Sequence, residues 1–235
     1  MNSASPRIAI IGDYDERKVV HQGTNAEFPA AGADVAWIPT DSIGDPAKSL
    51  RDFDGIIISP GSPYVDEEAV IASVRYAREN EVPLVGMCAG FQYVTVEFVR
   101  SVLGVAGANH AETHPDSEKL AVTPLVCSLA GESHPVHVLP GTRAASAYRQ
   151  ERVIEPFFCN YGINPEFEPR LADAGLAVSG RDEMGRPRII ELAGHPFFLA
   201  TLYVFQVRDR HVEPHPLTAA FLEAARARLM KSRTK

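Results

Sequence analysis

Four short apolar runs in the N-terminal half restrict the folds that this chain can adopt. Each run ends at a glycine, a proline or the start of a turn, which is typical of a buried strand. The runs are Arg7–Gly12, Asp34–Pro39, Gly55–Ser59 and Pro83–Met87. After the third and fourth runs, apolar residues recur at helical spacing in the segments Asp66–Asn80 and Phe91–Leu103. Strands that alternate with helices predict an α/β fold: a doubly wound, mostly parallel sheet with helices on both faces.

The C-terminal half has a less regular pattern. Five short segments are predicted strands: Ala121–Leu125, Val136–Leu139, Leu176–Gly180, Arg188–Leu192 and Leu199–Val204. The segment Gly180–Arg188 is typical of a hairpin connection with Met184 and Gly185 at its tip. Pro214–Lys235 is predicted to be a helix whose basic residues near its end suit the helix dipole. The chain has neither repeats nor a recognisable linker, so we expect a single domain over residues 1–235.

Charge and hydropathy exclude several classes of function. The chain has 235 residues and a net charge of −7, which argues against binding to nucleic acid through phosphate contacts. No apolar run approaches the length of a membrane span, and the N-terminus lacks the pattern of a signal peptide. We therefore expect a cytoplasmic protein that acts on a small-molecule substrate without nucleic-acid or membrane partners. Self-association into a homo-oligomer stays open.

The three cysteines, Cys88, Cys127 and Cys159, are odd in number and widely spaced. Without a signal peptide, this pattern predicts free thiols in a reducing compartment. No two cysteines have the CxxC spacing of a zinc site, and we expect no metal and no cofactor.

Cys88 directly follows the strand predicted at Pro83–Met87, in the stretch PLVGMCAGFQ. Ala89 and Gly90 are small enough for a sharp turn into the next helix, which is the geometry of a nucleophile elbow. The N-terminus of that helix favours a thiolate, and the N–H of Ala89 can stabilise an oxyanion. The alternative is that Cys88 is an inert buried thiol, because free cysteine is among the most buried residue types.

A second loop is predicted at the same edge of the sheet. Ser59–Tyr64 follows another strand, and the carboxyl ends of parallel strands gather ligands at one edge. Gly61 can bring a bare backbone N–H close to such a ligand. The alternative is an ordinary turn glycine.

Longer stretches of the chain resemble the glutamine amidotransferase domain of CTP synthase, a class I (triad) amidotransferase. The matching stretches include DGIIISPGS, RYARENEVPLVGMCAGFQ, EFVRSVLGVAGANHAE, YGINPEF, LADAGLAVSGRDEMGRPRIIELAGHPFFLAT and PHPLTAAFLEAA. The chain is still more similar to stand-alone proteins that are related to the C-terminal region of CTP synthase. The resemblance implies a flavodoxin-like core with the cysteine at its elbow. It also implies that this cysteine attacks a carboxamide and that water then releases a carboxylate.

The chain departs from the resembled domain at the triad and at the substrate site. Val204 and Gln206 fall where the family has the histidine and the glutamate of His-Pro-Glu. Valine cannot accept a proton, and glutamine cannot stabilise an imidazolium as a carboxylate does. Asn160 falls where an arginine helps to hold the α-carboxylate of glutamine, and Pro63 has no backbone N–H for a ligand. We therefore expect a degenerate triad and no efficient glutaminase activity.

One difference adds a titratable group. Where the resembled domain has Ala-Asn-Ser-Thr-Glu, this chain has Ala-Asn-His-Ala-Glu at residues 108–112. Glu112 matches a glutamate that contacts bound glutamine, and His110 lies in a segment that borders the pocket of the resembled fold. His110 is thus a candidate base for Cys88, and the alternative is a surface or hydrogen-bonded histidine. The predicted site comprises catalytic Cys88, His110 and Glu112, and oxyanion or substrate-binding Gly61, Ser62, Ala89, Gln92, Asn160 and Tyr161.

Three functions fit these residues. The leading hypothesis is a cysteine-dependent hydrolase or transferase that acts on a small amide, either γ-glutamyl-like or another amino-acid derivative. The second is a non-catalytic pseudo-amidotransferase that binds a small molecule or regulates a partner. The third is a thiol redox sensor, for which the sequence shows no resolving cysteine near Cys88.

Overall fold

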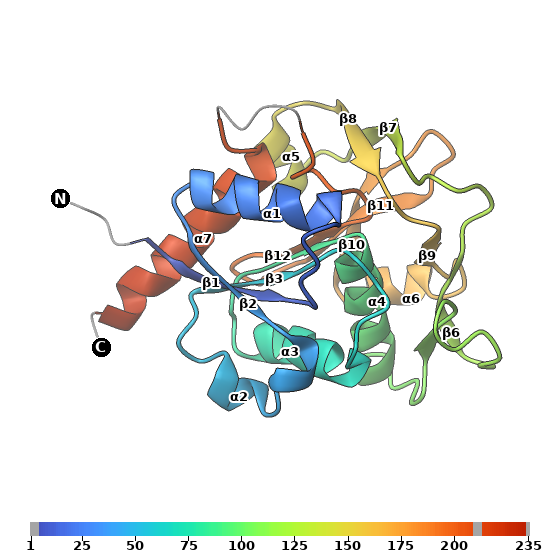
Figure 1. Cartoon of the computed structure of the whole chain (residues 1–235). Coiled ribbons are helices and arrows are strands. Elements are labelled where there is room, and N and C mark those ends of the chain that lie inside the picture. Colours follow the sequence, from blue (N-terminus) through green and yellow to red (C-terminus); the bar gives the residue numbers. More distant parts are fainter. Residues whose placement is uncertain (1–4, 209–212, 234–235) are drawn as a thin grey trace.

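The fold is taken from a computed structural model, which describes residues 5–208 and 213–233. A sheet of nine strands runs through its centre in the order β2-β1-β3-β4-β12-β11-β10-β7-β8 (Figure 1). These strands are β1 (Arg7–Ile11), β2 (Asp34–Ile38), β3 (Gly55–Ile58), β4 (Leu84–Met87), β7 (Glu132–Val138), β8 (Arg152–Phe157), β10 (Leu176–Arg181), β11 (Pro187–Leu192) and β12 (Phe198–Thr201). The four N-terminal strands coincide with the four apolar runs. Strands β3 and β4 are buried at every position and β1 at all but its first, as expected for apolar strands covered on both faces, whereas the edge strand β2 is only partly buried.

The sheet has a parallel half and an antiparallel half. Strands β2, β1, β3, β4 and β12 pair in parallel, as expected for a doubly wound fold. Strands β11, β10, β7 and β8 continue the sheet through antiparallel pairs, so the whole sheet is mixed. The predicted hairpin joins β10 to β11, and Gly185 at its tip has a φ of 78° that favours glycine.

Helices cover both faces of the sheet. Figure 1 shows α1 (Val19–Ala30) and α7 (Pro216–Arg233) on one side, with α3 (Glu67–Glu79) and α4 (Ala89–Ser101) on the other. This confirms the expected α/β class with a doubly wound core. Short helical turns complete the set: η1 (Thr40–Ser42), α2 (Pro46–Ser49), α5 (Arg143–Tyr148) and α6 (Glu168–Asp173). None of the helices in the described ranges has the length and apolarity that a membrane crossing requires.

Local sequence explains where α3 begins and how it meets α4. The Asp66 carboxylate caps α3 by accepting a hydrogen bond from the N–H of Ala69 at 2.9 Å. Near the other end of α3, Arg78 donates to Glu97 of α4 at 2.7 and 3.1 Å. The Glu97 side chain is fully buried, so this ion pair neutralises a charge that could not otherwise remain inside.

A glycine lets α4 begin directly against the sheet. A Cβ on Gly90 would lie 2.5 Å from the carbonyl oxygen of Ile58 at the end of β3, which is closer than real Cβ atoms come. Since α4 starts one residue after Cys88, this contact holds the start of the helix at the carboxyl edge of the parallel strands. That edge is where open α/β sheets bind their ligands.

A second sheet of three strands packs on α4. It consists of β5 (Asn109–His110), β6 (Leu120–Pro124) and β9 (Tyr161–Ile163), and each of the three contacts α4. This small sheet brings residues 109–112 and 160–161 towards the first turns of α4. Two segments of the predicted site, distant in sequence, therefore lie beside the elbow.

Candidate active site

Cys88 occupies a tight turn between β4 and α4. Its φ of 52° is uncommon for a residue with a side chain, and its N–H donates to the Thr201 carbonyl oxygen of β12 at 2.9 Å. This is the strand-turn-helix geometry of a nucleophile elbow. The side chain stands at the N-terminus of α4, where the helix dipole favours a thiolate.

A cavity of about 280 Å³ opens beside the sulfur of Cys88. Of the nine predicted site residues, seven line it: Gly61, Ser62, Cys88, Gln92, Glu112, Asn160 and Tyr161. Larger hollows of about 700 and 680 Å³ lie along α7, and Cys88 lines neither of them. The remaining two predicted residues, Ala89 and His110, are buried and do not line the cavity. Nowhere in the described ranges are three His, Cys, Asp or Glu side chains grouped as metal ligands would be.

His21 of α1 holds the Gly61 loop through a hydrogen bond to the backbone of that loop. The His21 Nδ1 accepts a hydrogen bond from the N–H of Asp15 at 3.0 Å, so its Nε2 carries the proton and donates to the Pro60 carbonyl at 2.9 Å. Burial lowers the pKa of His21, which favours this neutral form. A Cβ on Gly61, whose φ is 105°, would lie 2.8 Å from the His21 ring. No local sequence pattern around His21 predicts that it holds the Gly61 loop.

Ser62 and Glu112 join two loops across the cavity. The Ser62 hydroxyl donates to the Glu112 carboxylate at 2.6 Å, although the two residues are 50 positions apart. This contact holds the loop after β3 against the segment after β5. Both residues were predicted to be part of the site.

His110 has a different environment from the one expected for a base. Its Nδ1 accepts a hydrogen bond from the N–H of Glu112 at 3.0 Å, so Nε2 carries the proton and donates to Gln92 Oε1 at 3.0 Å. Gln92 in turn donates to the Tyr161 carbonyl at 3.0 Å. The ring also stacks on Tyr93, with centroids 5.5 Å apart. Both ring nitrogens are thus engaged, and the side chain that reaches the cavity is that of Gln92.

Burial lowers the pKa of His110 to about 4, with a smaller contribution from His114. In the unfolded chain His110 binds a proton when the pH falls below its ordinary pKa of 6.5. In the folded protein His110 stays neutral until the pH approaches 4. Stability from this effect is complete above pH 6.5 and is lost as the pH falls towards 4.

We expect the substitution His110→Gln to remove this pH dependence. The wild-type protein and the variant are unfolded with urea at pH 7.5 and 4.5. The substitution can change the free energy of unfolding at pH 7.5 by some amount. Between pH 7.5 and pH 4.5, the free energy of unfolding of the variant should rise relative to that of wild type by about 2 to 3 kcal/mol. The other titrating groups contribute equally to the pH dependence of both proteins, so their contributions cancel in the comparison. An equal difference at both pH values would show that His110 binds protons alike in both states.

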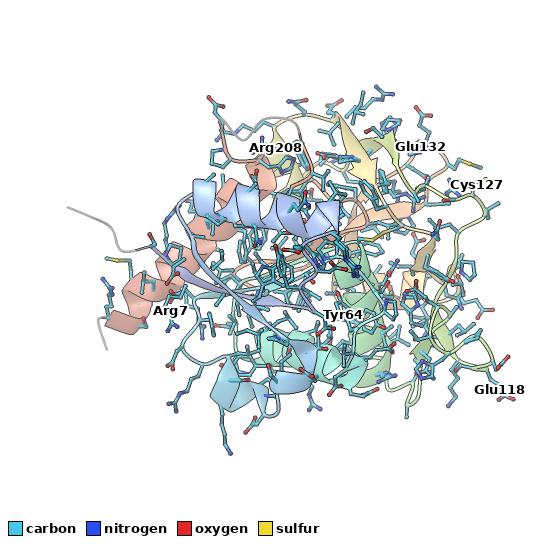
Figure 2. The ribbon with its side chains drawn as sticks, viewed as in Figure 1. Arg7, Tyr64, Glu118, Cys127, Glu132 and Arg208 are labelled. Carbon is cyan, nitrogen blue, oxygen red and sulfur yellow. A yellow bond between two sulfur atoms is a disulfide. The ribbon has the colours of Figure 1, made fainter. Side chains whose placement is uncertain are left out.

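Cys159 is the group nearest to the Cys88 sulfur. The two cysteines form a disulfide with a Cα–Cα distance of 6.0 Å, within the usual range for such bonds. Cys159 is 2% exposed, and its sulfur lies 3.1 Å from the Leu202 carbonyl oxygen. The prediction that all three cysteines are free thiols is therefore wrong for this pair, whose members are 71 residues apart. Cys127 is free and exposed at the outer edge of the molecule (Figure 2).

Lys18 also lines the cavity and was not predicted. It lies just before α1, and its ammonium group donates to the Gly61 carbonyl at 3.2 Å. Together with Glu112, it places one positive and one negative charge on the cavity wall. Asn160 adds no charge, and its side-chain oxygen accepts a hydrogen bond from Ser128 at 2.6 Å.

The segment after β12 is packed into the core beside the elbow. Val204 is fully buried and its N–H donates to the Pro156 carbonyl at 2.9 Å. Gln206 is also fully buried, and its Nε2 donates to the Val20 carbonyl at 3.3 Å and to Thr24 Oγ1 at 3.2 Å. Among the described residues, the lining of the cavity includes no histidine.

The fold and the position of Cys88 place the chain among α/β proteins that carry a strand-turn-helix elbow at the carboxyl edge of a mixed sheet. A family model for class-I glutamine amidotransferases matches residues 15–147. The chain belongs to the class-I glutamine amidotransferase family, as the resemblance implied.

Two relatives show how much of a longer protein the chain matches. It is 31% identical to the CTP synthase of Herpetosiphon aurantiacus, over 93% of this chain and 44% of that protein. It is 35% identical to the CTP synthase of Pyrobaculum aerophilum, again over 93% of this chain and 44% of that protein. The chain thus spans less than half the length of these curated relatives.

Solved structures confirm the fold. The glutaminase domain of Trypanosoma brucei CTP synthase, solved with bound acivicin, matches with a TM-score of 0.85 and 23% identity, over 94% of both chains. A glutamine amidotransferase from Thermotoga maritima matches with a TM-score of 0.61 and 12% identity, over 96% of this chain and 97% of that chain.

Proposed function

We propose that this chain is a cysteine-dependent hydrolase or transferase that acts on a small amide of an amino-acid derivative. The observation that carries the proposal is the placement of Cys88 at a positive-φ elbow beside a cavity that Lys18 and Glu112 also line. A chain that had kept only the fold would not need a strained cysteine at this turn. Efficient hydrolysis of glutamine itself is not part of the proposal.

The chemistry begins with the Cys88 thiolate. The thiolate attacks the carbonyl carbon of the amide, and the N–H groups of Ala89 and Gly61 stabilise the oxyanion. The C–N bond then breaks, the amine leaves with a proton, and the acyl group stays on Cys88 until water or an acceptor amine removes it. Lys18 and the hydrogen-bonded pair of Ser62 and Glu112 line the cavity and can exchange that proton.

In this scheme His110 is a positioning residue. It holds Gln92 through Nε2 and the backbone of Glu112 through Nδ1. A neutral ring with both nitrogens engaged orients two cavity residues without exchanging a proton with substrate. The sequence-based hypothesis that His110 is the base for Cys88 is replaced by this role.

The two charges of the cavity indicate the substrate class. The ammonium of Lys18 suits a carboxylate and the carboxylate of Glu112 suits an amino group, so an α-amino acid satisfies both. Lys18 in this way supplies the positive charge that Asn160 lacks. The acivicin bound to the Trypanosoma brucei domain is itself an amino acid with an electrophilic ring, which supports a ligand of this class.

Acivicin tests the proposal directly. With a dithiol present to keep Cys88 reduced, the thiolate should displace chloride from the acivicin ring and give an adduct on Cys88 in intact-protein and peptide mass spectra. We expect Cys88→Ser to give no adduct. We expect Lys18→Met to label about tenfold more slowly, because a charged hydrogen bond to the carboxylate is lost.

Lys48→Met is the matched control, since the side chain of Lys48 is 84% exposed and Lys48 does not line the cavity. It should label at the wild-type rate. Adducts on Cys127 instead of Cys88, or equal rates for Lys18→Met and wild type, would overturn the proposal. Reversible acivicin binding without any adduct would support the non-catalytic alternative. The lack of a histidine among the described residues that line the cavity favours this alternative.

A further inference from the structure

The nucleophile of the elbow has a second cysteine within bonding distance. Cys159 belongs to the connection between β8 and β9, lines the same cavity and is joined to Cys88 in the structure. We propose that the two cysteines form a redox couple in which Cys88 reduces a hydroperoxide and Cys159 resolves the product. This inference rests on the nucleophilic character of Cys88 proposed above. It adds a second activity to the same site.

The two sulfurs have unequal surroundings, which assigns their roles. Cys88 stands at the N-terminus of α4, whose positive end favours its thiolate. Cys159 is 2% exposed, and its sulfur lies 3.1 Å from the carbonyl oxygen of Leu202. A carbonyl oxygen accepts a hydrogen bond from a thiol and repels a thiolate. The Cys88 thiolate is therefore the group that attacks the peroxide, and Cys159 remains a protonated thiol during that step.

The backbone supports the disulfide at both ends. The N–H of Cys88 donates to Thr201 at 2.9 Å, and the carbonyl of Cys159 accepts from the N–H of Leu129 at 3.2 Å. With the Cα atoms 6.0 Å apart, side-chain rotation alone makes or opens the bond. The dithiol and the disulfide can thus interconvert on one backbone.

The two cysteines alone supply the two electrons that reduce the hydroperoxide, so the reaction needs neither a metal nor a cofactor. The Cys88 thiolate attacks the hydroperoxide, the O–O bond breaks, an alcohol or water leaves after taking up a proton, and Cys88 becomes a sulfenic acid. The sulfur of Cys159 then attacks the sulfenic sulfur. The S–O bond breaks, the S–S bond forms, and hydroxide leaves as water with the proton of Cys159. Cys88 has given two electrons to the peroxide and shares the oxidation with Cys159.

The co-reactant that restores the site is an external dithiol. One of its thiolates attacks the Cys88 sulfur, which lines the cavity, and releases the Cys159 thiol. The second thiol of the reductant then closes its own disulfide and frees Cys88. While the Cys88–Cys159 bond persists, Cys88 cannot attack an amide, so peroxide also switches off the proposed amide chemistry.

The test uses the whole 235-residue chain, reduced with dithiothreitol and freed of reductant. One equivalent of hydrogen peroxide is added together with dimedone, which traps sulfenic acids. We expect wild type to consume the peroxide, lose two hydrogens in the intact mass and yield a Cys88–Cys159 peptide. Cys159→Ser should consume peroxide but accumulate a dimedone adduct on Cys88 at least about tenfold above wild type, because nothing resolves it.

Cys127→Ser is the matched control and should match wild type, because Cys127 is exposed and does not line the cavity. An equal dimedone adduct in wild type and Cys159→Ser would overturn the resolving role. Peroxide consumption by Cys88→Ser at the wild-type rate would overturn the role of Cys88. Disulfide formation without acivicin labelling of the reduced protein would refute the amide chemistry alone, and the reverse result would refute the couple alone.

Discussion

Glutamine is expected to be hydrolysed by this chain at least about 10⁴-fold more slowly than by an amidotransferase with a complete Cys-His-Glu triad. Val204 stands where the resembled domain has its histidine, and it is buried with no group that can move a proton. The α4 N-terminus can favour the Cys88 thiolate, but it cannot protonate leaving ammonia. Because Asn160 is uncharged, the carboxylate of glutamine would also have to bind the single ammonium group of Lys18 instead of a guanidinium that can donate two hydrogen bonds.

Release of glutamate from glutamine, followed with a coupled dehydrogenase under reducing conditions, measures this rate. Cys88→Ala provides the background, because any glutamate that it releases comes from a contaminant or from spontaneous hydrolysis. Reduction must be complete, since the disulfide with Cys159 would by itself give a false negative. A rate typical of enzymes in wild type, absent from Cys88→Ala, would contradict the prediction.

Elements that depend on local sequence were predicted closely. The buried strands β1, β3 and β4 are continuous apolar runs, and α3 begins one residue after its capping residue Asp66. Helix α1 was missed because its own sequence opposes a helix: it contains Gly23 and Pro29. Tertiary packing overrides that preference. A Cβ on Gly23 would lie 2.9 Å from the Gln206 carbonyl, so the glycine is needed where α1 meets the segment after β12.

In the candidate site, too, some residues could be predicted from local sequence and others could not. Cys88 directly follows β4 and Gly61 lies three residues after the end of β3, so both could be predicted, because the topology brings those strand ends to one edge. The partners of these residues come from distant positions: Cys159 is 71 residues from Cys88, and His21 is 39 residues from the carbonyl that it holds. No periodicity in the sequence encodes such pairs.

His110 shows a further limit of the sequence. Its segment was placed near the pocket correctly, but the pairing of β5 with β6 has a register shift between Asn109 and His110. Sequence alternation cannot predict the side-chain direction at such an irregularity. In the structure the ring bonds to Gln92, and this contact supports the proposed positioning role.

Placing a histidine at position 204 and a glutamate at position 206, where the resemblance implies the triad groups, should not give glutamine hydrolysis and should destabilise the fold. In the double substitution Val204→His with Gln206→Glu, the larger histidine enters a fully buried position. Glutamate at position 206 loses the two N–H bonds that Gln206 donates to Val20 and Thr24. It instead places a carboxylate against the Val20 carbonyl and against a Thr24 hydroxyl whose hydrogen already bonds that carbonyl.

We expect Gln206→Glu alone to lower the free energy of unfolding by about 3 kcal/mol or more at pH 7.5, because the buried charge has no compensating partner in these contacts. Gln206→Met, which keeps the size without the charge, should cost about 1 to 3 kcal/mol. Urea unfolding of both variants separates the loss of hydrogen bonds from the burial of charge. A charged variant as stable as the methionine variant would show that position 206 can hold a carboxylate. Glutamine turnover by the double variant would then show that the cavity beside Cys88 is still a glutamine site.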